Sequence, residues 1–368
     1  MSAPGSRPVN DLAELKEYVR AHARVQRIPD YQALLDRVRT DEGDGAGSWV
    51  GEWCRAGEVF ERQDKDLEAA RHYAMARFPY VNGPERQEAL ERCVAAVDRW
   101  RSGNADVEPL DIPLDGGQVR CWTSGLSTKD PKPLLIVMGG IVSVKEQWAP
   151  TLAGLRRLGV AGLVTELPSV GENTLRYQQD SWRMLSRILD AVADRADVTR
   201  TYAIALSFSG HLALRCAMDD PRIRAIVTVG APVNRFFTDA GWQRRVPRIT
   251  VDTLAHMMGT KPDDVIGGLD GWELDPDRLG ELAIPVSYGA SLRDEIIPAA
   301  DWELLRDRVP RAEVMEIDDV HGSPNHVSEM HLWTVRSLLR AVGARGPQSA
   351  VIGMLLAAHR LRRRLSGG

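Results

Sequence analysis

Apolar side chains in the first hundred residues recur at the spacing of amphipathic helices. Residues 11–19 and 31–38 place them three and four positions apart, and glycines within 43–47 then interrupt the pattern. Proline, asparagine and glycine within 79–84 mark a turn between two further helical patterns. We therefore predict helices over 11–19, 31–38, 67–76 and 85–100. Together they predict a helical N-terminal domain over residues 1–104, with a short linker at its end.

Strand-like patterns begin after residue 104. Two strands are predicted at 108–113 and 119–123, with the hairpin signal Asp115-Gly116-Gly117 between them. From Leu134 onward, short apolar runs alternate with helical patterns, which is typical of a mostly parallel, doubly wound sheet with helices on both faces. The helices predicted here cover 146–158, 180–195, 210–219, 300–309 and 326–342. The predicted fold class is α/β, with a core that spans 105–346.

Residues 235–282 are too many for a simple connection between two strands, because long loops without regular structure are uncommon in compact domains. We predict a helical insertion that forms a lid, with helices at 251–258 and 262–268. Its large apolar residues are Phe236, Phe237, Trp242, Met257 and Met258. They either form the wall of an apolar substrate pocket or pack the insertion onto the core, and both interpretations stay open. Glu172 and Asp239 are further candidates for the pocket.

The C-terminal segment, 347–368, combines an apolar stretch with Arg360, Arg362, Arg363 and Arg364. We favour a helix packed against the body of the protein or a second subunit, with its basic end at the negative end of the helix dipole. Basic amphipathic helices also bind anionic lipid surfaces, so a membrane-surface helix is the alternative. The apolar run is too short to span a bilayer.

Composition changes this picture little. The 368 residues carry a formal net charge of −4, which gives no electrostatic footprint for nucleic acid. The four cysteines, Cys54, Cys93, Cys121 and Cys216, lack C-x-x-C spacing, so neither a zinc site nor a disulfide framework is expected. No signal-peptide pattern opens the chain. We expect a cytoplasmic enzyme that acts on a small molecule without cofactor, metal or membrane partner; a homodimer stays open.

The β-like run 201–204 leads directly into Ala205-Leu206-Ser207-Phe208-Ser209, and a helical pattern follows at once. A tight strand-to-helix turn with small residues around one serine is typical of a nucleophile elbow, which exposes the serine hydroxyl above a sheet. The usual form is G-x-S-x-G, and Ala205 and Ser209 stand in place of its glycines here. Ser207 is therefore the candidate nucleophile, although serine is also a common helix N-cap.

An acid and a histidine follow this serine in the chain order of an α/β-hydrolase triad. Asp294 comes after a predicted strand at 284–290, and His321 comes after one at 312–317. Because parallel strands deliver their C-terminal ends to one face, the three side chains can converge there. His321 would take the proton of Ser207, and Asp294 would fix the imidazole tautomer. The rival residues are Glu295, His326 and His331.

The loop 139–146 supplies a candidate oxyanion hole. In this fold, one backbone N–H comes from the residue after the nucleophile and another from the loop after the third strand. Phe208 would supply the first, and Ile141 or Gly140 the second, because glycines let the backbone approach a substrate closely. The alternative is an ordinary strand-to-helix turn, with Lys145 in an exposed first helical turn.

These motifs resemble those of the FrsA-type α/β hydrolases, a family that includes dihydroxypseudooxynicotine hydrolase. The resemblance rests on 139–146, on Glu166-Leu167-Pro168-Ser169-Val170-Gly171-Glu172 and on the elbow, and it covers most of the chain. It implies an α/β-hydrolase fold behind a helical N-terminal domain. It also implies the following site residues: the triad Ser207, Asp294 and His321, with oxyanion amides at Ile141 and Phe208.

We therefore predict a serine hydrolase that removes an ester or acyl group from a small, largely apolar molecule of specialised metabolism. The chain also resembles hydrolase-fold enzymes of tetronate antibiotic pathways that eliminate acetate, in which case His321 would deprotonate a carbon. Family members that cleave carbon–carbon bonds are expected to use an additional acid after the sixth strand, where this chain offers only Asp239. A non-catalytic, partner-binding module is the alternative from a different class.

Overall fold

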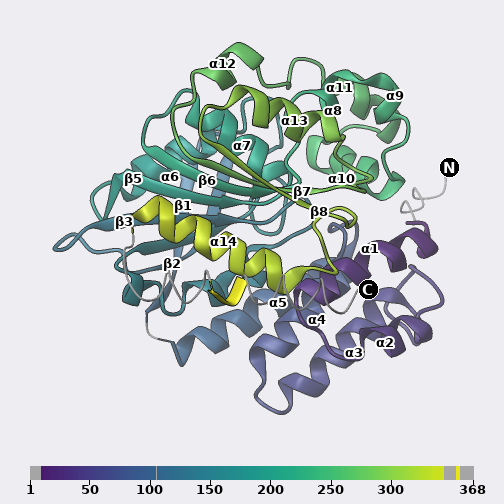
Figure 1. Cartoon of the computed structure of the whole chain (residues 1–368). Coiled ribbons are helices and arrows are strands. Elements are labelled where there is room, and N and C mark those ends of the chain that lie inside the picture. Colours follow the sequence, from purple (N-terminus) through teal and green to yellow (C-terminus); the bar gives the residue numbers. More distant parts are fainter. Residues whose placement is uncertain (1–9, 105, 344–353, 357–368) are drawn as a thin grey trace.

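The computed structural model describes residues 10–104, 106–343 and 354–356 (Figure 1). Most of the C-terminal segment that we predicted to form a helix lies outside the described residues. Its described part is a helical turn that contains Leu356, which is buried in a cluster with Met330 and Trp333. Among the described residues, no helix is both long and apolar enough to cross a membrane.

An eight-stranded sheet forms the core, in the order β1-β2-β4-β3-β5-β6-β7-β8. β1 pairs with β2 and β2 pairs with β4 in antiparallel fashion, whereas all the other pairs are parallel. β3 and β4 are nearly continuous apolar runs, as strands covered on both faces must be. The strands are β1 (Val107–Leu114), β2 (Gly117–Ser124), β3 (Lys132–Met138), β4 (Ala161–Thr165), β5 (Ala196–Ala205), β6 (Ile223–Val229), β7 (Val286–Ser291) and β8 (Ala312–Ile317).

Helices cover both faces of this sheet. α6 (Arg183–Val192), α7 (Phe208–Ala217) and α13 (Ala299–Arg308) lie on one side, and α14 (Val327–Val342) lies on the other (Figure 1). Both α7 and α14 contact the central strands β5 and β6. The predicted mostly parallel sheet with helices on both faces is therefore confirmed, and the loops that follow the parallel strands meet at one edge.

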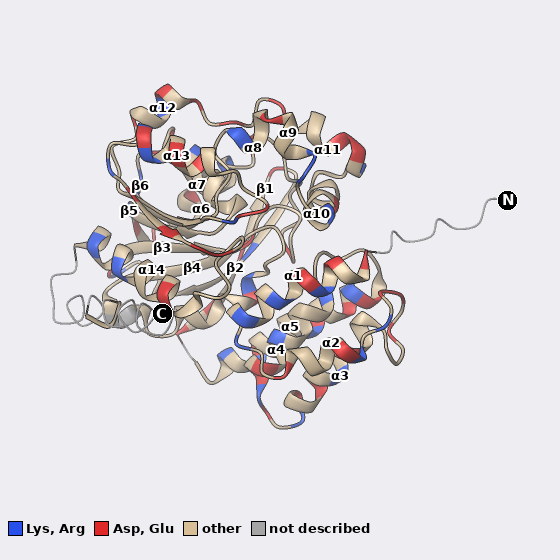
Figure 2. Cartoon of the chain, turned by 45° about the vertical axis from the view of Figure 1, so that its right-hand side comes forward, with Lys and Arg blue, Asp and Glu red and all other residues tan. Residues whose placement is uncertain are grey.

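Within residues 10–104, five helices precede the sheet and pack around Trp49, Trp53 and Tyr73, and we call them the helical unit. They are α1 (Leu12–Val25), α2 (Tyr31–Arg37), α3 (Trp49–Glu61), α4 (Asp66–Arg77) and α5 (Pro84–Ser102). Figure 2 shows that acidic and basic residues are interspersed along the helices of this unit. The sequence did not predict α3, because the glycines before it suggested a loop. Ser48 begins this helix by accepting the N–H of Gly51 at 3.1 Å.

Two predicted helices need correction. The segment 146–158 is not one helix but three short 3-10 turns, η1 (Lys145–Gln147), η2 (Ala149–Leu152) and η3 (Leu155–Leu158). Pro150 lacks the N–H that a helix interior needs, and Gly154 has a positive φ of 97°, so a continuous helix is not favoured there. The helix predicted at 180–195 is shorter, because α6 ends at Val192 and β5 begins at Ala196.

The connection between β6 and β7 is helical. It contains α8 (Arg235–Thr238), α9 (Ala240–Gln243), α10 (Arg248–Met258), η4 (Pro262–Asp264), α11 (Val265–Gly268) and α12 (Pro276–Gly280). α10 also touches the helical unit, because Glu14 of α1 accepts the N–H of Ile249 at 3.1 Å. This insertion and the helical unit therefore meet above the strand ends that carry the candidate site.

Candidate active site

Ser207 occupies the turn between β5 and α7. Its φ of 57° and ψ of −129° lie outside the regions that non-glycine residues prefer, which costs of order 1–3 kcal/mol. Backbone hydrogen bonds maintain the turn, with the N–H of Ser207 donating to Val229 at 2.8 Å and that of Leu206 donating to Met138 at 3.0 Å. The Ser207 side chain makes no capping hydrogen bond to α7. The geometry is thus that of an elbow that presents the hydroxyl, not of an N-cap.

His321 and Asp294 complete a hydrogen-bonded chain that begins at this hydroxyl. The Oγ of Ser207 lies 3.1 Å from Nε2 of His321, and Nδ1 of His321 lies 2.9 and 3.0 Å from the carboxylate oxygens of Asp294. A carboxylate only accepts, so Nδ1 carries the proton and Nε2 is free to accept from Ser207. Burial lowers the pKa of His321, but the charges of Asp294 and Glu295 outweigh it and leave this pKa above its usual value.

The rival residues have other partners. Glu295 accepts the backbone N–H of His321 at 3.0 Å and a hydrogen bond from the hydroxyl of Tyr18 in α1. His326 pairs with the buried Asp319 at 2.8 Å, and Asp319 also accepts N–H groups from the loop that carries His321. Burial lowers the pKa of the remaining rival, His331. Asp294, not Glu295, therefore faces the imidazole.

The loop after β3 runs against the nucleophile. A Cβ added at Gly140 would lie 3.1 Å from Cβ of Ser207, so that the backbone of this residue approaches the serine closely. Ile141 follows it, and Phe208 is the first residue of α7, where helix N–H groups have no partner within the helix. The two predicted oxyanion donors thus flank Ser207, on the loop after β3 and at the start of α7.

A cavity of about 90 Å³ opens beside Ile141, between the helical unit, the loop after β4 and α10. It is lined by Arg77, Tyr80, Val81, Ile141, Ser169, Val170, Gly171, His256 and Met257. Tyr80 and His256 stack with their ring centroids 4.6 Å apart, one from the helical unit and one from α10. The cavity wall is therefore mixed, with apolar side chains and a small number of polar ones.

The helical unit places a further histidine near the site that the sequence did not predict. His22 of α1 packs against Phe78, with ring centroids 5.2 Å apart. Burial, together with the charges of His321 and Arg77, lowers its pKa to about 4. Next to it, Arg24 donates to Asn325 in the loop that carries His321, at 2.6 Å. No sequence signal could have found His22, because it lies far from His321 along the chain.

The other predicted pocket residues lie elsewhere. Phe236 packs edge to face on Phe208, with centroids 5.2 Å apart, and Phe237 packs on His211. Asp239 caps α9 by accepting the N–H of Trp242, whose indole N–H donates to Ile296. Glu172 binds Lys145 and Arg120. Of the predicted apolar wall, Met257 lines the cavity beside Ile141, whereas Phe236, Phe237 and Trp242 are absent from its described lining.

No group of metal-ligating side chains gathers among the described residues. The polar side chains at the candidate site instead form a chain of proton donors and acceptors, from Ser207 through His321 to Asp294. Such an arrangement can activate a hydroxyl for attack on a carbonyl carbon. It can also remove a proton from a bound molecule, since Nε2 of His321 is the free basic position.

Comparisons with known proteins identify a family that this chain resembles over most of its length. A family model for FrsA-like esterases, described as "Esterase FrsA-like", matches residues 16–271. Esterase FrsA of Vibrio cholerae serotype O1 is 25% identical over 286 residues, which cover 72% of this chain and 68% of that protein. Esterase FrsA of Escherichia coli O157:H7 is 26% identical over 266 residues, 64% of each chain.

Solved structures show the same overall fold. Wild-type AbyA5 superposes with a TM-score of 0.91 and is 52% identical, covering 95% of this chain and 99% of its own. The 2,6-dihydroxy-pseudo-oxynicotine hydrolase superposes with a TM-score of 0.69 at 18% identity, covering 87% of this chain and 96% of its own. The second likeness establishes the fold alone. The predicted α/β-hydrolase fold is thereby confirmed.

Proposed function

The chain belongs to the FrsA-like esterase family, and on this premise we propose that it is a serine hydrolase that uses Ser207, His321 and Asp294 as its catalytic triad. The observation that carries the proposal is the hydrogen-bonded chain from the Ser207 hydroxyl to a buried carboxylate, at 3.1 and 2.9 Å. A serine in a strained turn, with the basic nitrogen of a histidine directed at it, meets the geometric requirement for an activated nucleophile.

In the proposed reaction, Oγ of Ser207 attacks an acyl carbonyl while Nε2 of His321 takes its proton. Asp294 stabilises the imidazolium that forms. The N–H groups of Ile141 and Phe208 receive the negative oxygen, and each such donor is worth about 3 kcal/mol in the transition state. His321 then returns the proton to the leaving alcohol. Water, activated by the same imidazole, releases the acid from the acyl-enzyme.

The cavity beside Ile141, whose wall has both polar and apolar side chains, supports a small acylated substrate. Val81, Val170 and Met257 offer apolar contacts, while Tyr80 and His256 offer hydrogen bonds. A few convergent polar groups in an otherwise apolar pocket are the usual means of fixing a ligand's orientation. We infer that the acyl group or the ring of the substrate enters this cavity. Substrates from specialised metabolism would fit this chemistry.

Elimination of acetate is the second candidate, with a product alkene in place of an alcohol. His321 would remove a proton from carbon, the neighbouring C–O bond would break, and acetate would leave with the bond's electron pair. The likeness to AbyA5, at 52% identity, is greater than that to the FrsA esterases, at 25%, and supports keeping a candidate other than ester hydrolysis. The chemistry of this chain can therefore differ from that of those esterases. Acetylated tetronates are the substrates to test.

Carbon–carbon cleavage would need a further acid at the site, and the loop after β6 does not supply one among the described residues. Its Asp239 caps α9, and the buried Asp301 accepts the N–H groups of residues 233–236. We therefore place carbon–carbon hydrolysis behind the first two candidates. A non-catalytic binding module is the remaining alternative, and the labelling experiment below separates it from both enzymes.

The test is intact-protein mass after treatment with a fluorophosphonate, for the wild type and for Ser207→Ala, with short aryl acetates assayed in parallel. A single adduct that the variant lacks, together with ester turnover, would support the serine hydrolase. Alkene formation from an acetylated tetronate by both proteins would favour elimination, because that route needs no acyl-enzyme. A folded wild type with neither adduct nor product would leave the binding module.

A further inference from the structure

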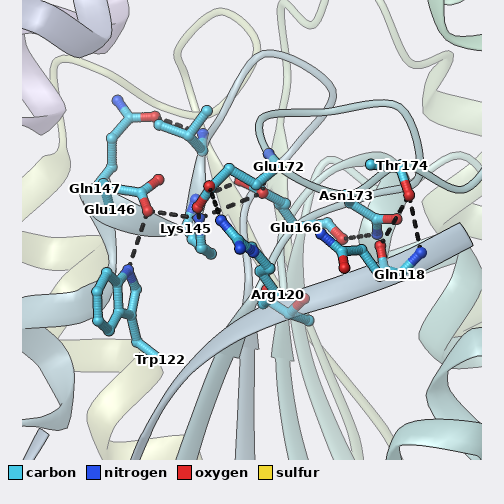
Figure 3. A network of polar contacts seen from close by, with 12 residues as sticks. Gln118, Arg120, Trp122, Lys145, Glu146, Gln147, Glu166, Glu172, Asn173 and Thr174 are labelled. Atoms are coloured by element: carbon cyan, nitrogen blue, oxygen red, sulfur yellow. Dashed lines mark hydrogen bonds and ion pairs between the residues drawn. The ribbon is translucent and has the colours of Figure 1, made fainter. Parts of the chain in front are cut away.

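A buried network of charged side chains lies behind the oxyanion loop 139–146 (Figure 3). The ammonium of Lys145 lies 2.6 Å from a carboxylate oxygen of Glu146, 2.6 Å from one of Glu172 and 3.7 Å from one of Glu166. Lys145, Glu146 and Glu166 are almost fully buried, with side chains 2% exposed or less. The alternative in which Lys145 stands on an exposed helical turn is therefore wrong.

Glu166 joins the two loops that enclose the cavity. Its Oε2 accepts the backbone N–H of Lys145 at 2.9 Å, and its Oε1 accepts the backbone N–H of Glu172 at 2.7 Å. The first N–H belongs to the loop that carries Ile141, and the second to the loop that follows β4 and lines the other side of the cavity. Gly171 lies directly on the carboxylate, where a Cβ would come within 2.3 Å of Oε2.

Contacts from β2 and α4 hold the same loop from other directions. The indole N–H of Trp122 donates to Glu146 at 3.0 Å, and Arg120 pairs with Glu172 at 2.6 Å (Figure 3). The guanidinium of Arg77 donates to the carbonyl of Val142, the residue after Ile141, at 2.6 Å. The backbone around the proposed oxyanion donor is thus fixed by directional bonds on several sides.

Stability alone does not account for so many buried charges. A buried ion pair is often no more stabilising than well-packed apolar residues of the same size, because desolvation costs offset the attraction. Burial raises the pKa of Glu166 to about 7, against the charge of Lys145, which lowers it. What such a network supplies, and apolar packing does not, is a fixed direction for the two N–H groups that it binds.

We propose that Lys145 and Glu166 are positioning residues that hold the Ile141 amide where the oxyanion of the reaction forms. Glu166 ties the oxyanion loop to the loop after β4, and Lys145 keeps the three carboxylates in place. Neither side chain touches the reacting atoms. The inference rests on the proposed acyl-transfer function and extends it to residues that lie behind the site.

The first test compares wild type with Glu166→Gln and Lys145→Met on 4-nitrophenyl acetate. An interaction made only in the transition state lowers kcat and kcat/KM equally when it is lost. We expect kcat to fall by about 10²-fold, towards the loss of one oxyanion donor, with KM nearly unchanged. The rate of fluorophosphonate labelling at Ser207 should fall in parallel. Folded variants with wild-type kcat would overturn the inference.

Glu52→Gln is the matched control. Glu52 also accepts a backbone N–H, that of Gly47 at 2.9 Å, and pairs with Arg37 and Arg55, but it lies in the helical unit. We expect this variant to lose thermal stability and to keep kcat. If its kcat falls as far as that of Glu166→Gln, the effect is a general loss of stability and the inference is wrong.

Two milder variants decide the matter if Glu166→Gln does not fold. Gly171→Ala displaces the Glu166 carboxylate without removing a charge. Glu172→Gln changes the partly exposed edge of the network, where the Glu172 side chain is 20% exposed. Both should lower kcat, and KM should stay the same in Glu172→Gln, whereas Gly171 itself lines the cavity. Unchanged kcat in both would overturn the inference. Failure of the proposed function gives a different result, because wild type itself would then show neither labelling nor turnover.

Discussion

Asp294→Asn should abolish nearly all hydrolysis while leaving the fold intact. Oδ1 of Asp294 accepts the N–H groups of Ile296 and Ile297 at 2.9 and 2.8 Å, and an asparagine oxygen can keep both bonds. The amide nitrogen would then occupy the position of Oδ2, which lies 2.9 Å from Nδ1 of His321. Oδ1 also lies 3.0 Å from Nδ1, but the two backbone N–H groups already use its lone pairs, so the amide N–H makes Nδ1 the acceptor. The proton moves to Nε2, which can no longer accept from Ser207.

The wrong tautomer removes the general base, and such a change lowers kcat by about 10⁴-fold in a serine triad. That corresponds to about 5 kcal/mol of transition-state stabilisation. The residual activity should also change its pH dependence. Asp294 keeps the pKa of His321 above its usual value, and activity needs the neutral imidazole. Without that charge, burial lowers the pKa of His321, so the acid limb of kcat/KM should move to lower pH.

The assay is turnover of 4-nitrophenyl acetate between pH 5 and 9, with thermal unfolding to confirm the fold. Glu295→Gln is the control, because Glu295 accepts the backbone N–H of His321 and the hydroxyl of Tyr18 and does not contact the imidazole as Asp294 does. It should cost far less activity than Asp294→Asn. A folded Asp294→Asn that retains a tenth of the wild-type kcat would refute the assignment, and so would a larger loss in Glu295→Gln.

Three further outcomes are expected. Gly230→Ala should abolish activity and labelling in a folded protein, because its Cβ would come within 2.7 Å of the His321 ring and its φ is 61°; wild-type labelling would contradict this. Burial lowers the pKa of His211 to about 4, so the protein loses unfolding free energy as pH falls below 6.5 and the unfolded state takes up a proton that the folded state does not. His211→Phe should remove this loss, which is about 2 kcal/mol between pH 7 and pH 5 when measured by denaturant titration. Val81→Trp should raise KM for bulky acyl esters and spare acetates, which steady-state kinetics on an ester series would check.

The parts of this site that could be predicted are those that local sequence encodes. Ser207 stands between a strand-like run and a helical pattern, and Asp294 and His321 each follow a strand. The ends of parallel strands converge in any doubly wound sheet, so no knowledge of side-chain packing was needed to bring the three together. The structure then decided between Asp294 and Glu295, which are neighbours in the chain and differ only in which way their side chains point.

The parts that could not be predicted depend on contacts between distant segments. The sequence offers no sign that His22 lies near His321, because α1 reaches that position only through packing of the helical unit. Lys145 and Glu166 are charged residues of a kind usually found at the surface, and only the fold reveals that both are buried in one network. The helix predicted at 146–158 failed for a different, local reason, because Pro150 and Gly154 interrupt the helical pattern there.

The helical unit contributes to the candidate site as well as covering it. Tyr18 of α1 donates to Glu295, and Glu295 in turn accepts the backbone N–H of His321. Arg24 of the same helix donates to the loop that carries His321, and Arg77 of α4 donates to the oxyanion loop. Contacts from one unit therefore reach both the base and the oxyanion donors. Because Tyr80 and Val81 of this unit also line the cavity, we expect a change in how the unit packs to alter both the rate of the reaction and access to the cavity.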